Sequence, residues 1–222
     1  MTEPKLKTRR SRVFIIDDHP IVREGIALQI GGEPDMVVCG EAEDVADALA
    51  RIPAAVPDVI LVDISLKTGN GIDLVKRIRA RGSTVRILVW SMHAENLYAE
   101  RALRAGANGY VNKRDATRQV LEGLRAVLAG KVYVSADLAS QLLTRLVSGS
   151  RAAAGAVALL TDRELEAFNL LGRGLSTQQI AEQMHVSPKT VETYRIRVKE
   201  KLGVTTLAEL IQRATHWVLE ND

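Results

Sequence analysis

The most constraining feature of the chain is an alternation of short apolar runs with segments of helical period over residues 13–131. The apolar runs are rich in Val, Ile and Leu, which is typical of strands buried on both faces of a sheet. Between them, apolar residues recur every three or four positions, which predicts amphipathic helices. Five strands alternating with five helices indicate a doubly wound parallel α/β sheet. The predicted strands are residues 13–16, 36–39, 59–62, 87–90 and 109–111.

The remainder of the chain has only helical signals. Apolar spacing predicts a helix over residues 138–147, and the small residues of 148–155 indicate a flexible linker. Four capping signals then predict an all-α domain of four short helices over residues 159–222. These signals are Thr161 with Glu164, Ser176 with Gln179, Ser187 with Pro188, and Thr206 with Glu209. The predicted domains are therefore residues 12–131, a helix and linker over 132–156, and 157–222.

Length and composition fit two globular domains and exclude several classes of protein. A chain of 222 residues with 46% hydrophobic and 26% charged residues is not extensively disordered. The single cysteine, Cys39, excludes an intramolecular disulfide, and no Cys/His cluster has zinc-ligand spacing. The first apolar run ends at once in Asp17-Asp18, so no signal peptide is expected, and no apolar run is long enough for a membrane span. We therefore expect a soluble, cytoplasmic protein without a membrane partner.

The net charge of +3 does not locate a binding surface. Residues 1–12 carry +4, residues 13–158 are balanced, and residues 159–222 carry −1. The basic excess thus lies in the N-terminal tail, so the total charge alone does not identify a nucleic-acid interface.

Four of the predicted strands end in charged or hydroxyl side chains that can bind ligands or take part in catalysis. Asp17 and Asp18 follow the first strand, Asp63 the third, Ser91 ends the fourth, and Lys113 follows the fifth. The carboxyl ends of parallel strands meet at one edge of a sheet, so these groups are expected to converge. Three neighbouring carboxylates repel one another and need a hard cation such as Mg²⁺. A carboxylate beside a metal and a lysine can attack phosphorus, although any one of these acids alone is more often a cap or turn residue.

Four motifs carry a resemblance to a known family. They lie in the same order along the chain as in that family, and together they cover about residues 12–130. The segments are VFIIDDHPIVREGI, DVILVDISL, ILVWSMHAE and ANGYVNK. They resemble receiver domains of two-component response regulators, most closely the NarL/FixJ group, which have a flavodoxin-like fold.

This resemblance implies a role for each residue of the predicted site. Asp63 would accept the phosphoryl group and Lys113 would contact it. Ser91 would bond the phosphoryl group after modification, and Tyr110 would reorient with Ser91. The implied Mg²⁺ ligands are Asp18, Asp63, the backbone carbonyl of Ser65 and, through water, Asp17.

Lys67, Trp90 and the four histidines are given no direct role in the predicted chemistry. Lys67 stands where the family usually has proline, and it would alter loop rigidity, kinase docking or phosphate lifetime. Trp90 is expected to pack under a neighbouring helix. The four histidines lack ligand spacing and are interpreted as loop, cap or surface residues. They are His19, His93, His185 and His216.

A helix-turn-helix is predicted at about residues 177–196. Its second helix has an apolar stripe of Val191, Tyr194, Val198 and Leu202 that should face the core. Residues 189–201 carry five basic and two acidic side chains, an excess that phosphate binding requires. A solvated helix with ordinary ion pairs is the alternative interpretation.

The segment LTDRELEAFNLLGRGLSTQQIAEQMHVSPKTVETYRIRVKEKLGV resembles the LuxR-type DNA-binding domain over about residues 155–220. The resemblance implies that the second helix enters the major groove, with Glu192, Thr193 and Ile196 facing base edges. Glu192 would either accept a hydrogen bond from a cytosine amino group or merely neutralise a neighbouring cation. The remaining candidate DNA contacts are Lys189, Thr190, Arg195, Arg197, Lys199 and Lys201.

We therefore expect a response regulator that a sensor histidine kinase phosphorylates on Asp63 and that binds double-stranded promoter DNA as a homodimer. RNA polymerase is a candidate further partner. The chain is not expected to be an enzyme beyond slow hydrolysis of its own aspartyl-phosphate. Two alternatives stay open. One is a phosphohydrolase with an aspartate nucleophile, although Asp63-Ile64-Ser65 lacks the second acid of such enzymes. The other is a DNA-binding protein whose receiver is a passive interaction module.

Overall fold

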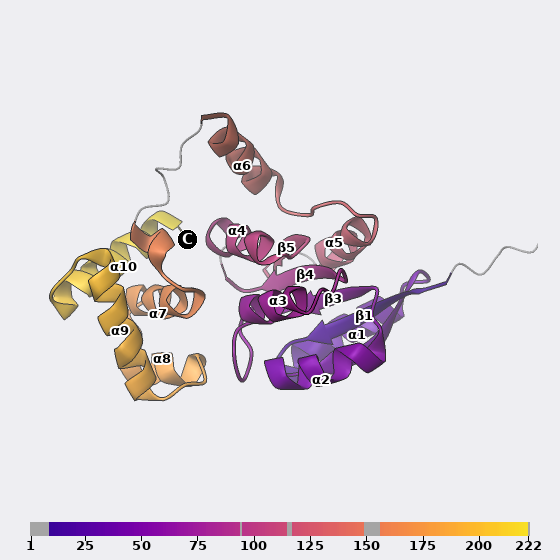
Figure 1. Ribbon diagram of the computed structural model, residues 1–222, viewed down its shortest axis with the longest axis horizontal. Helices are drawn as coiled ribbons and strands as arrows, with labels where there is room; N and C mark the ends of the chain where they lie inside the picture. The colour runs from indigo at the N-terminus through magenta and orange to yellow at the C-terminus, as the bar shows by residue number, and fades with distance from the viewer. Residues whose placement is uncertain (1–8, 94, 115–116, 149–155, 222) are drawn as a thin grey trace, which may run out of the picture. The chain divides into compact units, whose positions relative to one another are not determined.

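The computed structural model describes residues 9–93, 95–114, 117–148 and 156–221. The chain divides into two compact units, Met1–Ser135 and Ala136–Asp222. Figure 1 shows a sheet flanked by helices in the first unit and helices alone in the second. Most of the predicted linker, residues 149–155, lies outside the described residues, as does the basic tail up to residue 8.

The first unit contains the five predicted strands in one parallel sheet, so the α/β prediction is confirmed. The strand order is β2-β1-β3-β4-β5, which places β3 at the centre between β1 and β4. This order makes β1 and β3 neighbours although an entire strand-helix unit separates them in the chain. The strands are β1 (Ser11–Ile16), β2 (Met36–Ala42), β3 (Val59–Val62), β4 (Arg86–Ser91) and β5 (Gly109–Asn112).

Helices cover both faces of this sheet because the central strands are apolar on both sides. Alternate residues such as Val13 and Leu61 pack against α1 and α5 on one face, and Trp90 lies in the same cluster, as predicted. Residues of opposite parity, such as Phe14 and Ile60, are also fully buried. The helices are α1 (Pro20–Gly31), α2 (Val45–Ala55), α3 (Gly71–Ala80), α4 (Glu95–Ala105) and α5 (Thr117–Leu128).

The second unit contains the four predicted C-terminal helices, preceded by the predicted helix α6 (Ala136–Ser148) and a short 3-10 turn at Ala156–Leu159. Local capping sets the helix starts. The Thr161 and Ser176 hydroxyls each accept from the backbone N–H three residues on, and Glu164 and Gln179 cap back. The four helices are α7 (Asp162–Gly172), α8 (Thr177–Gln183), α9 (Pro188–Leu202) and α10 (Leu207–Asn221).

The apolar stripe of α9 faces the core of the second unit, with one correction. Val191, Val198 and Leu202 are buried, whereas Tyr194 is only half-buried. Tyr194 therefore lies at the border of the apolar face rather than inside it. Across the described residues, no helix combines the length and the apolar character that a membrane crossing requires.

Candidate functional site

The carboxyl ends of β1, β3 and β5 bring together three charged side chains from distant parts of the sequence. The Lys113 ammonium lies 2.5 Å from Asp17 Oδ2 and 2.6 Å from Asp63 Oδ2. All three side chains are almost completely buried, with 7%, 1% and 4% of their surface exposed. A buried cation is thus held between two buried carboxylates, which is the convergence that the strand ends predict.

Burial and charge act against each other in this group. Burial raises the pKa of Asp63, since the charged form loses its hydration, and the Lys113 ammonium counteracts part of that effect. For Lys113, burial favours the neutral form, but the charges of Asp63 and Asp17 outweigh it, so its pKa is raised. The Lys113 ammonium therefore stabilises the charged form of Asp63, which burial disfavours.

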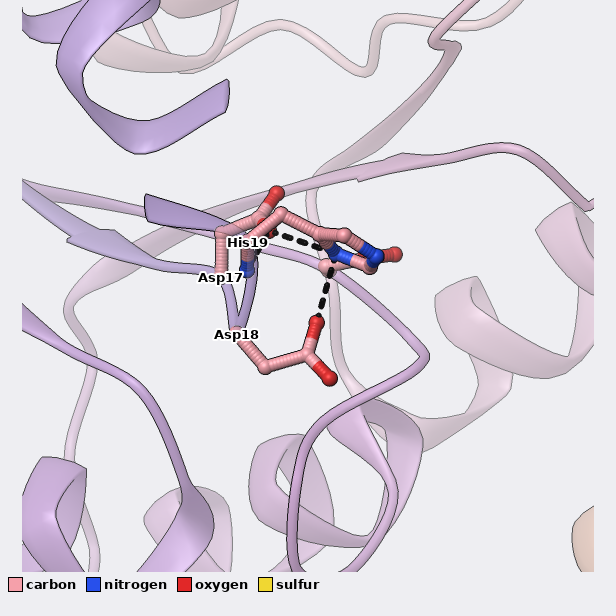
Figure 2. Close-up of side chains that lie close together, drawn as sticks. Asp17, Asp18 and His19 are labelled. Atoms are coloured by element: carbon pink, nitrogen blue, oxygen red, sulfur yellow. Dashed lines mark hydrogen bonds and ion pairs between the residues drawn. The ribbon is translucent and has the colours of Figure 1, made fainter. Parts of the chain in front are cut away.

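Asp18 and His19 complete the group at its solvent side. The ring of His19 lies between the two acids, with Nδ1 2.8 Å from Asp18 Oδ1 and 3.3 Å from Asp17 Oδ1 (Figure 2). His19 is also the residue before the first turn of α1, and its side chain is 64% exposed. The cap interpretation of His19 is therefore incomplete, because its ring also contacts the acids. Its position directly after the acid pair was the sequence signal for this contact. We call Asp17, Asp18, His19, Asp63 and Lys113 the acidic pocket.

The donor set of the acidic pocket fits a hard divalent cation. Asp17, Asp18, His19 and Asp63 each offer one ligand atom, and these atoms all lie within 4.8 Å of one another. Three of the four residues are carboxylates, which suits the oxygen preference of Mg²⁺. The Ser65 backbone lies beside them, since its N–H donates to Asp63 Oδ1 at 3.4 Å.

The loop after Asp63 is tightly closed although it lacks the proline of the family. Ser65 and Asn70 form an antiparallel bridge, and buried Asn70 caps α3 by accepting from the Ile72 N–H at 2.8 Å. Gly71 follows, and a Cβ at that position would lie 1.9 Å from the Asp63 carbonyl oxygen. Only glycine allows this close approach. Lys67 projects from the loop to an exposed ion pair with Glu43 at 2.9 Å.

Ser91 and Tyr110 lie beside the acidic pocket and are connected through His93, for which the interpretation as a loop, cap or surface residue is incomplete. Ser91 is fully buried at the end of β4, and Tyr110 is 1% exposed in β5. The Tyr110 hydroxyl donates to the His93 carbonyl at 2.7 Å, and the Asn112 amide donates to the same oxygen at 3.1 Å. His93 Nε2 lies 3.0 Å from the Ser65 hydroxyl. His93 therefore joins the segments that follow β3 and β4 and, through Tyr110, β5; its position two residues after Ser91 was the only sequence signal.

The second candidate site is the helix pair α8 and α9, joined by a short turn as predicted. Most predicted DNA-contact side chains on α9 lie on its accessible surface. Lys189, Glu192, Thr193 and Arg197 are exposed, and the aliphatic side chain of Ile196 is 52% exposed. Thr190 and Lys199 are partly exposed.

Two cations of α9 are engaged inside the second unit. The Lys201 ammonium lies 2.6 Å from Oε2 of Glu164, which is almost fully buried in α7. Arg195 is only 13% exposed and donates to the Glu192 carboxylate at 2.6 Å and to the Thr177 hydroxyl at 2.7 Å. The local charge excess therefore overstates the free positive charge of this helix.

Comparison with known proteins assigns both units. The model of the response regulator receiver domain matches residues 13–125. The model of the bacterial regulatory proteins of the luxR family matches residues 158–214. The chain belongs to the response regulators that join a receiver domain to a LuxR-type DNA-binding domain. This membership favours the DNA-binding regulator over the phosphohydrolase.

Known relatives match this chain along most of their length, across both of its units. The chain is 36% identical to the DNA-binding transcriptional activator DevR/DosR of Mycobacterium tuberculosis over 193 residues, which are 87% of this chain and 88% of the relative. It is 32% identical to the response regulator UvrY of Escherichia coli over 202 residues, 91% of this chain and 92% of the relative. Among solved structures, RcsB of Salmonella enterica serovar Typhimurium, bound to promoter rprA with the phosphomimetic BeF3⁻, matches with 27% identity and a TM-score of 0.61. That match covers 93% of this chain and 99% of RcsB.

Proposed function

We propose that this response regulator accepts a phosphoryl group on Asp63 from a sensor histidine kinase, and that this modification controls its binding to promoter DNA. The observation that carries the proposal is the buried Asp17–Lys113–Asp63 group at the carboxyl edge of a receiver sheet. A carboxylate that could accept a phosphoryl group lies beside a buried cation in this group, which supports the proposal. Asp63 also has the neighbours that the family pattern requires, since Ser91 and Tyr110 are buried next to it.

The proposed reaction transfers a phosphoryl group from a histidine nitrogen of the kinase to a carboxylate oxygen of Asp63. An Asp63 carboxylate oxygen attacks the phosphorus of a phosphohistidine, the phosphorus–nitrogen bond breaks, and the imidazole leaves with the bond electrons. Asp17, Asp18, Asp63 and the Ser65 carbonyl would hold Mg²⁺, which neutralises charge on the phosphoryl oxygens when it is bound. The Lys113 ammonium already contacts Asp63 and keeps contact with the new phosphoryl group. Slow hydrolysis returns the pocket to its starting state.

Phosphorylation changes the conformation of the segment that follows β4. The bound phosphoryl group carries roughly −1.5 to −2 at neutral pH and supplies strong hydrogen-bond acceptors. Because it replaces the single negative charge of the Asp63 carboxylate, the pocket gains at most about one negative charge. The Ser91 hydroxyl turns to donate to it and draws the His93 backbone with it, because the His93 N–H is hydrogen-bonded to Ser91 Oγ at 3.4 Å. Tyr110 follows, since its hydroxyl is bonded to the His93 carbonyl. The receiver surface around α4 and β5 then changes and favours a homodimer.

In this proposal, α9 enters the major groove of promoter DNA. Lys189, Thr190, Arg197 and Lys199 supply the phosphate contacts, while Glu192, Thr193 and Ile196 face base edges. Two copies read paired half-sites, and RNA polymerase is the next partner of a promoter-bound regulator. Because DNA is the partner, the protein acts in the cytoplasm.

The decisive experiment measures DNA affinity of the full chain with and without a small phosphodonor such as acetyl phosphate, on a site selected from random DNA. The wild type should gain one phosphoryl group by intact mass and bind more tightly, whereas Asp63→Asn should do neither. Asp73→Asn removes an exposed acid of the same type from α3 and should behave as the wild type. Equal affinity of all forms with and without the donor would refute the control of DNA binding by Asp63 and leave the receiver as a passive module.

A further inference from the structure

Three polar side chains form a small network on the face of the helix pair that is proposed to meet DNA. The Arg195 guanidinium donates to both the Thr177 hydroxyl and Glu192 Oε1, at 2.7 and 2.6 Å. The Thr177 hydroxyl donates in turn to the same Oε1 at 3.0 Å. We call these residues the Glu192 triad. It connects the first residue of α8 to the middle of α9.

The triad fixes one carboxylate oxygen of Glu192 and leaves the other available. Both contacts fall on Oε1, and within the described parts of the chain no residue donates to Oε2. The Glu192 side chain is 51% exposed, whereas that of Arg195 is 13% exposed. Glu192 is thus a pre-positioned acceptor whose charge is already compensated by a cation beneath it, which lowers its repulsion from DNA phosphates.

The neighbours of Glu192 narrow what this acceptor can recognise. The Thr193 hydroxyl is engaged with the Lys189 carbonyl at 3.0 Å, so it is a weaker candidate for base recognition. Ile196 lies four residues after Glu192 on the same face of α9 and is 52% exposed. In the major groove, a carboxylate accepts from the cytosine N4 amino group, and apolar side chains contact the thymine methyl group.

From the triad we infer that Glu192 reads a cytosine through Oε2 and that Ile196 reads a thymine methyl group nearby; the inference rests on the proposed DNA binding. Four helical residues rise by about 6 Å. Successive base pairs rise by about 3.4 Å. Side chains one helical turn apart can also reach adjacent base pairs, so the two recognised pairs are expected one or two base-pair steps apart within each half-site. In this arrangement Oε2 of Glu192 accepts from the base, while Oε1 neutralises the Arg195 cation.

The experiment selects bound sequences from random DNA with full-length protein treated with acetyl phosphate, for the wild type and three variants. The wild type should show cytosine at one position of each half-site. Glu192→Ala should lose the preference at that position alone. Glu192→Gln should change it toward adenine, because glutamine pairs with adenine N6 and N7. Glu200→Ala removes an exposed acid from the same helix and should select the wild-type site.

Affinities then test the assignment on the selected site. Replacing the cytosine pair should weaken wild-type binding by about tenfold or more, and Glu192→Ala binding by much less. The change of preference in Glu192→Gln cannot arise from misfolding, since a misfolded protein selects nothing. A wild-type site that Glu192→Ala and Glu192→Gln select unchanged would overturn this inference alone. Failure of the wild type to select any site would overturn the proposed function as well.

Discussion

The acidic pocket and helix α9 both concentrate charge, but the two regions hold it in opposite ways. In the pocket, Asp17, Asp63 and Lys113 are separated by up to 96 residues and meet with less than a tenth of their side-chain surface exposed. On α9, the charges come from one continuous helix, and most of them are exposed. Removing one partner of a buried charge leaves the other uncompensated and destabilises the fold. Exposed charges act on other molecules through an electrostatic field that salt screens. We therefore expect single substitutions to damage the pocket severely and to change the helix gradually.

The largest effect is expected from Lys113→Met. Removal of the ammonium leaves Asp17 and Asp63 buried and uncompensated, which should cost about 3–5 kcal/mol of unfolding free energy. Mg²⁺ should restore part of the loss, because it compensates the same carboxylates. Urea unfolding in a Trp217→Phe background measures this, since Trp90 is then the sole tryptophan and lies in the receiver.

The matched control for this prediction is Lys67→Met, which removes the same side chain from an exposed ion pair with Glu43. It should leave the unfolding curve unchanged. Equal destabilisation by both variants would show that burial of the pocket charges does not distinguish the two regions.

The next effect tests a buried ion pair of the C-terminal domain, which resembles the charge group of the pocket. Glu164 is buried, and its contacts with Lys201 and the Thr161 backbone outweigh the opposing effect of burial, so its pKa is lowered from the ordinary value near 4.5. A lowered pKa stabilises the fold above the ordinary pKa, and this contribution is lost as the pH falls through the lowered value. Glu164→Gln should therefore cost about 1–3 kcal/mol at neutral pH and make unfolding less dependent on acid pH.

Trp217 fluorescence in a Trp90→Phe background reports this unfolding. Glu220→Gln changes an acid whose side chain is 62% exposed and should keep both the stability and the acid sensitivity of the wild type. If stability fell with decreasing pH in Glu164→Gln just as in the wild type, the buried pair with Lys201 would not contribute to stability.

A smaller effect separates free from engaged cations on α9. If Lys189 and Arg197 contact phosphates, Lys189→Ala and Arg197→Ala should each reduce the slope of log affinity against log salt concentration by about 1. Lys201→Met should leave the slope unchanged, because its ammonium is paired with buried Glu164. Fluorescence anisotropy on the selected site at several salt concentrations measures the slopes, and a reduced slope in Lys201→Met would contradict the distinction.

The smallest effect is a spectroscopic one. The Lys113 ammonium lies 5.1 Å from the centre of the Trp90 ring, a cation–π arrangement. Transfer of the Lys113 contact to a phosphoryl group should alter Trp90 emission. In a Trp217→Phe background, acetyl phosphate should change the emission of the wild-type pocket and not that of Asp63→Asn. An identical response of both would assign the change to a process other than phosphorylation.

Much of the fold and the pocket followed from local patterns in the sequence. Strand and helix periods predicted the order of elements, because burial on a sheet and on a helix imposes different spacings. Asp63 and Lys113 were predicted together, since both follow strands of one parallel sheet. The capping boxes at Thr161 and Ser176 were likewise readable, because both partners lie within four residues.

Only the tertiary structure decided which of the charged side chains are engaged. The Lys201–Glu164 pair spans 37 residues, Arg195 and Thr177 are 18 apart, and Lys67 reaches Glu43 across 24. His93 could not be recognised as a connecting residue, since its contacts involve its own carbonyl and a loop 28 residues away. Sequence spacing determines which residues share an element. The packing of elements against one another determines which charges are neutralised and which remain available to DNA.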